Sequence, residues 1–128
     1  MKFALTAAIA GLALLAACAS MDDAGPAKVG DSSLGKVLTD GKGMTLYTFD
    51  RDAPGKSNCN GQCAQNWPPM TASADAKAAG EWTVVTRDDG AKMWAYKGKP
   101  LYTWVRDTKP GDVTGDGFAN NVWHVAKP

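Results

Sequence analysis

The heptapeptide LYTFDRD at residues 46–52 recurs as LYTWVRD at residues 101–107, with five identical residues at an offset of 55. With one residue inserted, four further positions match: Pro54-Gly55 with Pro110-Gly111, Gly61 with Gly117, and Trp67 with Trp123. Self-similarity over such a span indicates an internal duplication. We therefore expect two copies of one structural unit, at about residues 34–70 and 82–128.

Aromatic residues in both heptapeptides follow the spacing of a β-strand. Tyr47 and Phe49 are two residues apart, as are Tyr102 and Trp104, so each pair shares one face of a strand. Further strands are predicted at residues 82–86, 92–96 and 122–125. Only residues 72–79 suggest a helix. The sequence predicts an all-β, mostly antiparallel domain of about 6–8 short strands, in which a duplicated hairpin or meander unit forms a small barrel-like or sandwich fold.

Each heptapeptide ends in an aspartate, Asp52 or Asp107, that is followed by a Pro-Gly turn. The simplest interpretation is that the carboxylate accepts backbone N–H groups of this turn. The alternative is that it contacts a ligand or an ion. Duplication favours the first interpretation, because both copies must make the same turn.

The start of the chain has the layout of a secretory signal peptide. Lys2 precedes an apolar stretch at residues 3–14, and Leu15-Ala16-Ala17 leads to Cys18. The apolar run is short of the roughly 20 residues that span a bilayer. The cysteine after the small residues resembles the bacterial lipobox, which implies cleavage before Cys18 and acylation of this residue.

The lipobox sets the expected domain organisation. Residues 1–17 are the signal peptide, residues 18–33 are the lipidated cysteine with a flexible tether, and residues 34–128 are one β domain. Because Ala19 and not Asp follows the cysteine, analogy favours the outer membrane, facing the periplasm or the exterior. The mature chain has equal numbers of basic and acidic residues, so we expect no nucleic-acid partner.

Cys59 and Cys63 are the two cysteines that remain if Cys18 is acylated. Export delivers them to an oxidising compartment, so we expect a disulfide between them. Two alternatives stay open. A thioredoxin-like redox pair has two intervening residues and not three, and a zinc site needs four ligands, while His124 is far away in the sequence.

These motifs together resemble a family of bacterial secreted-repeat lipoproteins with a Tyr-x-aromatic-x-x-Asp motif. Besides the lipobox and the two motif copies, the run CNGQCAQNWPP at residues 59–69 is similar to the family's cysteine and Trp-Pro-Pro segment. The second copy departs from this pattern, because Gly117, Phe118 and Ala119 stand where the first copy has Gly61, Gln62 and Cys63, so the disulfide loop exists once. The function of the family is unknown, so the resemblance implies a class and a location but no activity.

Several residues are candidates for metal or ligand binding. Carboxylates in a Gly- and Thr-rich loop suit calcium, but their spacing fits no EF-hand. Soft ligands could serve copper, although core methionines are more common. The weak metal candidates are Asp107, Asp112, Asp116, Met44, Met93 and His124. We expect solvated turns and core residues there, and no cofactor.

Trp67 is the tryptophan most expected to be exposed, because the adjoining Pro68-Pro69 cannot pair in a central strand. An exposed indole there would form a binding surface for a sugar ring or a hydrophobic partner. The sequence shows no nucleophile elbow, and Glu81 is its one glutamate.

We therefore expect a lipid-anchored envelope protein that acts as a non-enzymatic binding or structural module. It would contact the membrane through its lipid and an envelope protein or a glycan through its domain. The alternative is a periplasmic accessory protein for redox chemistry or for handling metal or haem.

Overall fold

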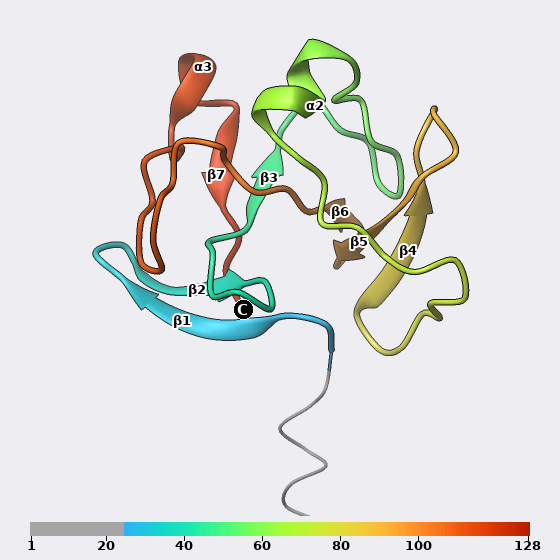
Figure 1. Ribbon diagram of the computed structural model, residues 1–128, viewed down its shortest axis with the longest axis horizontal. Coiled ribbons are helices and arrows are strands. Elements are labelled where there is room, and N and C mark those ends of the chain that lie inside the picture. The colour runs from blue at the N-terminus through green and yellow to red at the C-terminus, as the bar shows by residue number, and fades with distance from the viewer. Residues whose placement is uncertain (1–24) are drawn as a thin grey trace, which may run out of the picture.

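The computed structural model describes residues 25–128 (Figure 1). The predicted signal peptide and Cys18 lie outside these residues. The elements are, in chain order, β1 (Lys28–Ser32), β2 (Gly35–Thr39), β3 (Tyr47–Phe49), α2 (Gln62–Asn66), β4 (Trp82–Thr86), β5 (Lys92–Tyr96), β6 (Lys99–Pro100), α3 (Phe118–Asn121) and β7 (Trp123–Val125).

The strands form three small antiparallel sheets, β1-β2, β3-β7 and β4-β5-β6. The prediction of a mostly antiparallel β domain with little helix is confirmed. Within residues 25–128 the strands do not close into a barrel, and the two repeated units form a small sandwich. Neither helix of this part of the chain is long and apolar enough to cross a membrane.

The two copies exchange strands. In the first copy, β3 pairs with β7 of the second copy, with Phe49 opposite Trp123. In the second copy, Thr103 N–H donates to the Pro68 carbonyl of the first copy at 2.9 Å. The motif segment of each copy is therefore hydrogen-bonded to the closing segment of the other copy.

A pair of equivalent tyrosines lies at the centre of this exchange. Tyr47 N–H donates to the Tyr102 carbonyl at 2.7 Å, and Tyr102 N–H donates to the Tyr47 carbonyl at 3.0 Å. Farther out, Leu38 N–H donates to Ala126 O and Trp94 N–H donates to Met70 O, each at 2.9 Å. Because each bond has a counterpart at the matching position of the repeat, the copies are related by a pseudo-twofold axis between the tyrosines.

Two predictions from the sequence are wrong, the end of the tether and a helix at residues 72–79. The tether was expected to reach residue 33, but residues 28–32 form β1, which pairs along its whole length with β2. Its small and polar residues satisfy their backbone groups in this hairpin, so a polar composition did not mean an unpaired backbone. Residues 72–79 form turns and not a helix, and Ala72 N–H is held by the Lys92 carbonyl of β5 at 2.9 Å.

The core between the two copies is a stack of four aromatic rings. Trp123 stacks on Phe49 with ring centroids 4.2 Å apart, and on Trp67 with centroids 3.8 Å apart and an interplanar angle of 2°. Trp67 stacks in turn on Trp104 at 4.1 Å. The rings thus alternate between the copies, and their burial couples the copies through the hydrophobic effect.

Trp67 is therefore not the exposed binding surface that the adjoining prolines suggested, since Trp67 is only 3% exposed. The physical reason is that proline lacks a donor but keeps its acceptor. Pro68 accepts a hydrogen bond from Thr103 N–H, and Pro69 forms a β-bridge with Tyr102. The segment therefore pairs as a closing strand and turns the indole inward.

We predict that neither copy folds without the other, because the motif segment of each copy pairs with the closing segment of the other copy. Fragments 25–75 and 76–128, separated in the exposed turn between the copies, should lack near-ultraviolet circular dichroism of packed tryptophan when alone. Mixing should restore the signal of the intact chain, which serves as the control. Self-pairing of a fragment as a dimer would agree with the exchange, so the mass is measured too; a folded monomeric fragment would contradict it.

Candidate functional site

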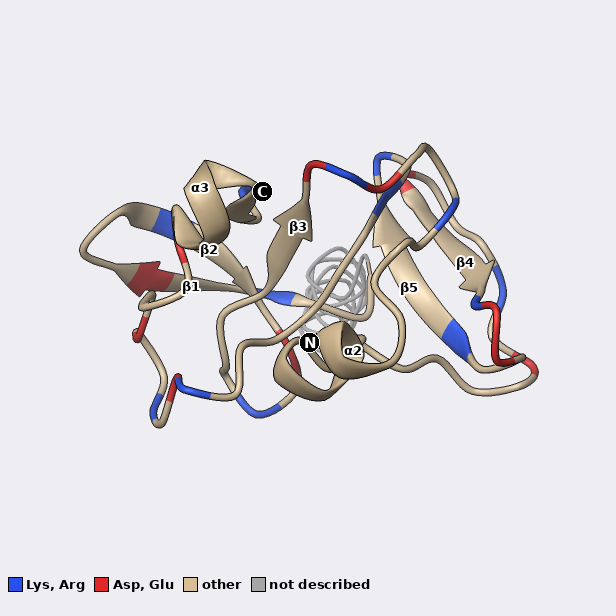
Figure 2. Cartoon of the chain, turned by 90° about the horizontal axis from the view of Figure 1, so that it is seen from above, with Lys and Arg blue, Asp and Glu red and all other residues tan. Residues whose placement is uncertain are grey.

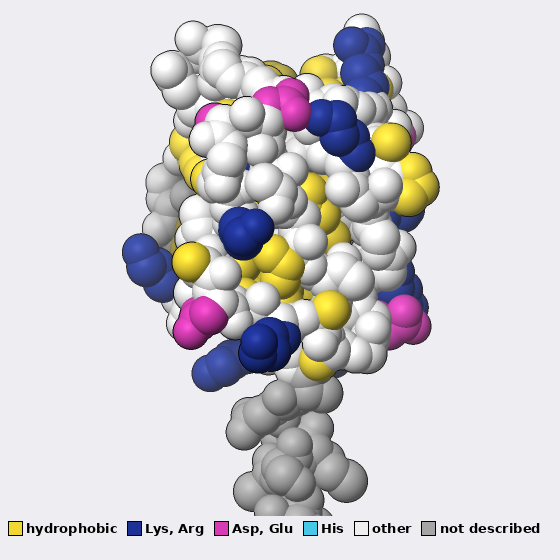
Figure 3. Space-filling view, turned by 90° about the vertical axis from the view of Figure 1, so that its right-hand side faces the viewer, with side chains coloured by type: hydrophobic (Ala, Val, Ile, Leu, Met, Phe, Trp, Pro, Cys, Tyr) yellow, Lys and Arg dark blue, Asp and Glu magenta, His cyan; other side chains and the backbone are white. Residues whose placement is uncertain are grey.

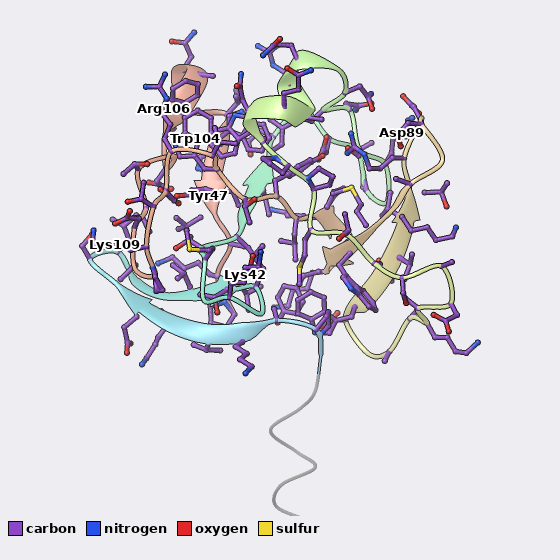
Figure 4. The ribbon with its side chains drawn as sticks, viewed as in Figure 1. Lys42, Tyr47, Asp89, Trp104, Arg106 and Lys109 are labelled. Atoms are coloured by element: carbon purple, nitrogen blue, oxygen red, sulfur yellow. A yellow bond between two sulfur atoms is a disulfide. The ribbon has the colours of Figure 1, made fainter. Side chains whose placement is uncertain are left out.

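The motif tyrosines and aspartates form two crossed hydrogen bonds. Tyr47 Oη donates to Asp107 Oδ2 at 2.6 Å, and Tyr102 Oη donates to Asp52 Oδ2 at 2.7 Å. Each bond joins the tyrosine of one copy to the aspartate of the other. Figure 4 shows Tyr47 and Trp104 inside the molecule, whereas Arg106 and Lys109 lie at its periphery.

The second oxygen of each aspartate holds the turn that follows the motif. Asp52 Oδ1 accepts Asn58 N–H at 2.7 Å, and Asp107 Oδ1 accepts Thr114 N–H at 3.0 Å. The interpretation of the aspartates as turn-forming residues is confirmed. The bond to the tyrosine of the other copy was missed, because a sequence match shows equivalence and not contact.

Burial controls the ionisation of this centre. Burial raises the pKa of Tyr47 far above its usual value, and the hydrogen bond to Asp107 raises it further. Burial likewise raises the pKa of Tyr102, and it also raises the pKa of Asp52, although the Asn58 N–H bond opposes the latter effect. Both hydroxyl groups therefore remain donors at neutral pH, as a structural hydrogen bond requires.

A buried arginine, Arg87, supports the disulfide loop. Its residue is only 5% exposed, and it donates to Ser57 Oγ at 2.9 Å and to the Cys59 carbonyl at 2.7 Å. Ser57 Oγ lies 2.6 Å from the hydroxyl of Tyr102, so the arginine is connected to the crossed bonds. In the sequence Arg87 stands in a polar turn beside Asp88-Asp89, so nothing there indicated its burial.

The predicted disulfide between Cys59 and Cys63 is confirmed, with the Cα atoms 5.2 Å apart. Cys59 is fully buried, and its carbonyl is held by Arg87. The disulfide closes a small loop around the start of α2, in the first copy only.

The weak metal candidates do not converge. Asp116 accepts Val125 N–H at 3.0 Å, and Lys109, with Thr108, holds the pKa of Asp112 at about 2. Met93 is buried beside Arg87, whereas His124 Nε2 lies 2.8 Å from Asp50 Oδ2. Within residues 25–128, no three or more His, Cys, Asp or Glu side chains gather in a way that could hold a metal ion.

Two adjoining cavities of about 260 and 270 Å³ lie between β3 and β6, and we call them the β3–β6 groove. Both are lined by Thr48, Asp50, Lys97 and Lys99. Phe49 and Asp52 also line the first cavity, and His124 and Lys127 also line the second.

A companion cavity of about 330 Å³ occupies the related place in the other half of the molecule, where Lys42 and Thr103 stand at the positions of Lys97 and Thr48. The other basic residues of the groove have no basic counterpart: Lys99 corresponds to Met44, His124 to Pro68, and Lys127 to Thr71. Elsewhere acidic and basic residues alternate along the chain (Figure 2). The groove thus has three lysines beside Asp50 and Asp52, whereas Lys42 and Asp40 are the charged residues that line the companion cavity.

A third, apolar hollow of about 580 Å³ lies where the described chain begins, and Pro26, Trp82 and Trp94 are among its lining residues. Figure 3 shows hydrophobic side chains gathered on this side of the molecule, with basic side chains around them. Gly25 packs directly on the Trp82 indole, so a side chain at this position would collide with the ring.

Fold and site together define a duplicated β module whose copies are interlocked by strand exchange. A family model, Lipoprotein_15, described as a secreted repeat of unknown function, matches residues 28–71 and 83–127. The chain belongs to this family, as the sequence motifs suggested, and a secreted family implies an extracellular or envelope location. No curated protein and no solved structure matches the chain.

We predict that Tyr47→Phe lowers the free energy of unfolding by about 1–3 kcal/mol, because the buried carboxylate of Asp107 loses its donor. Urea unfolding followed by tryptophan fluorescence measures the change. Tyr96→Phe is the matched control, since no hydrogen bond from its hydroxyl is found in the described structure, and it should change stability by less than about 0.5 kcal/mol. Equal effects of the two substitutions would contradict a structural role of the crossed bonds.

Proposed function

We propose that the protein is a lipid-anchored module of the cell envelope that binds an anionic ligand in the β3–β6 groove without converting it. The observation that carries the proposal is the difference between the two copies. The crossed bonds and the ring stack are shared by both copies and serve the fold, whereas the basic groove is not shared. A feature that the fold does not require is the better candidate for function.

Two lysines of the groove are free to meet a ligand, whereas Asp50 of the groove is paired with His124. Lys36, Lys56 and Lys109 are each paired with an aspartate. Lys97 and Lys99 have no carboxylate partner among residues 25–128, and the Lys97 ammonium lies over the Tyr96 ring at 5.2 Å. Since hydrogen bonds between ammonium and an anionic group are about twice as strong as neutral ones, an anion would gain most from binding here.

The anchor would act through Cys18, seven residues before Gly25. An extended chain of this length spans at most about 25 Å. The apolar hollow beside Trp82 and Trp94 would then lie near the membrane surface, where tryptophan is favoured. Ala19 after the cysteine supports the outer membrane as the location.

The alternative, an accessory protein for redox chemistry or for metal or haem, receives less support from the structure. Cys59 is fully buried and bonded through its carbonyl to Arg87, which suits a structural disulfide. The candidate ligands Met93 and His124 each have other partners.

We predict that growth with radiolabelled palmitate labels the wild-type protein and that Cys18→Ala abolishes the label, because the acylated thiol is lost. Fractionation should then find the variant outside the membrane fraction. Ser20→Ala is the control, since it leaves the cysteine and the residue after it in place. An unlabelled wild-type protein would refute the anchor.

We predict that replacing Lys97 and Lys99 together by Gln weakens binding of a carboxylate probe by about a hundredfold, because each lost charged hydrogen bond contributes about 1.5 kcal/mol, or roughly tenfold. The probes are trigalacturonate and triglutamate, measured by isothermal titration calorimetry at low salt. Lys42→Gln, at the position equivalent to Lys97, is the matched control and should leave the affinity nearly unchanged. Loss of affinity in the control, or no binding of either probe, would refute the groove as an anion site.

A further inference from the structure

The four-ring stack of the core ends differently in the two copies. At one end, the ring of Trp104 is packed against Phe118 with centroids 4.7 Å apart. At the other end, Phe49 stacks on Trp123, and no second ring packs on it in the part of the chain that the structure describes. The residue equivalent to Phe118 is Gln62, which has no aromatic ring to supply. The Phe49 end of the stack is therefore left without an aromatic cover.

Phe49 is only partly buried, and it lines the first cavity of the β3–β6 groove. Its position in the stack holds the ring in place, because Trp123 lies nearly parallel to it at an interplanar angle of 13°. A rigid aromatic ring that borders a cavity offers a flat apolar contact at low entropic cost. Lys97 and Lys99 line the same cavity.

We infer that the groove binds an acidic sugar, with the apolar face of one pyranose ring on Phe49 and its carboxylate on Lys97 and Lys99. The inference rests on the proposed function and names the ligand class of that site. The ring contributes a stacking surface, and the ammonium groups contribute charged hydrogen bonds. An acidic peptide would use the lysines but would leave the aromatic ring unused.

Size and polarity agree with a single sugar ring. At about 260 Å³, the cavity beside Phe49 is smaller than the roughly 300–1,000 Å³ of pockets for drug-sized ligands. Asp50 and Thr48 also line it and can exchange hydrogen bonds with sugar hydroxyl groups. Asp52 already accepts hydrogen bonds from Tyr102 and Asn58, so it lines the cavity but has less capacity to bind a sugar hydroxyl group.

The test compares three probes on the full mature chain by isothermal titration calorimetry: trigalacturonate, triglutamate and neutral maltotriose. Wild-type protein should bind trigalacturonate more tightly than triglutamate, by about fivefold for one stacking contact, and should bind maltotriose least. Phe49→Leu should remove this preference and leave triglutamate affinity unchanged. Phe49→Trp should keep the preference, because the equivalent residue Trp104 shows that an indole fits this place in the stack.

The possible outcomes distinguish between the acidic-sugar assignment and the more general anion site. Equal affinity of wild-type protein for trigalacturonate and triglutamate would overturn the sugar assignment and leave the anion site standing. Failure of both carboxylate probes to bind would overturn both. Thermal melting accompanies each variant, and if Phe49→Leu does not fold, the wild-type comparison of the three probes still decides the inference.

Discussion

The crossed hydrogen bonds between Tyr47 and Asp107 and between Tyr102 and Asp52 are the constraint on which the rest of the structure depends. Each carboxylate joins three things at once: its own turn, the tyrosine of the other copy and, through that tyrosine, the centre of the pseudo-twofold axis. Burial of these polar groups would be costly without the pairing, so the bonds select the one arrangement of the two copies that satisfies them. Strand exchange follows, because it brings each tyrosine to the opposite turn.

The two copies satisfy this constraint by different local means. In the second copy, Gly115 N–H donates to the Tyr47 hydroxyl, and a Cβ atom there would lie only 2.6 Å from the Trp67 ring. The equivalent position in the first copy is Cys59. Ser57, two residues earlier, provides the partner of Tyr102 with support from Arg87. In the second copy the backbone of Gly115 thus approaches the tyrosine and the tryptophan directly. In the first copy the disulfide and the buried Arg87 occupy the equivalent place. This explains why the disulfide occurs once in a duplicated chain.

The sequence was sufficient to predict features that depend on local pattern. The duplication, the strands at residues 82–86 and 92–96 and the turn role of the aspartates follow from spacing and residue type, and the structure contains them. The disulfide follows from the cysteine count and the export signal, and it is also present. What could not be predicted depends on partners distant in sequence. The burial of Trp67 depends on Thr103 and Tyr102, which pair with the adjoining prolines and lie more than 30 residues away in the sequence. Arg87 was missed because a buried cation is defined by the groups around it and not by its own neighbours in the chain.

Duplication also explains how a binding site could arise without cost to the fold. The inner rings of the stack, Trp67 and Trp123, hold the copies together and cannot change without losing their contact at 3.8 Å. Each outer ring, Phe49 or Trp104, packs on an inner ring on one side, and the fold requires that contact. On its other side, Trp104 is covered by Phe118, whereas no aromatic ring within residues 25–128 covers Phe49. The fold therefore does not require a ring at this outer position. The end of the stack can therefore differ between copies while its middle stays fixed. Positions such as Lys99 and His124, whose counterparts are Met44 and Pro68, lie around the uncovered end and can vary with the same freedom. The core is thus symmetric between the copies, whereas the residues around the two ends of the ring stack are not. Because of this difference, the uncovered end at Phe49 can be specialised for binding while Phe118 covers the other end.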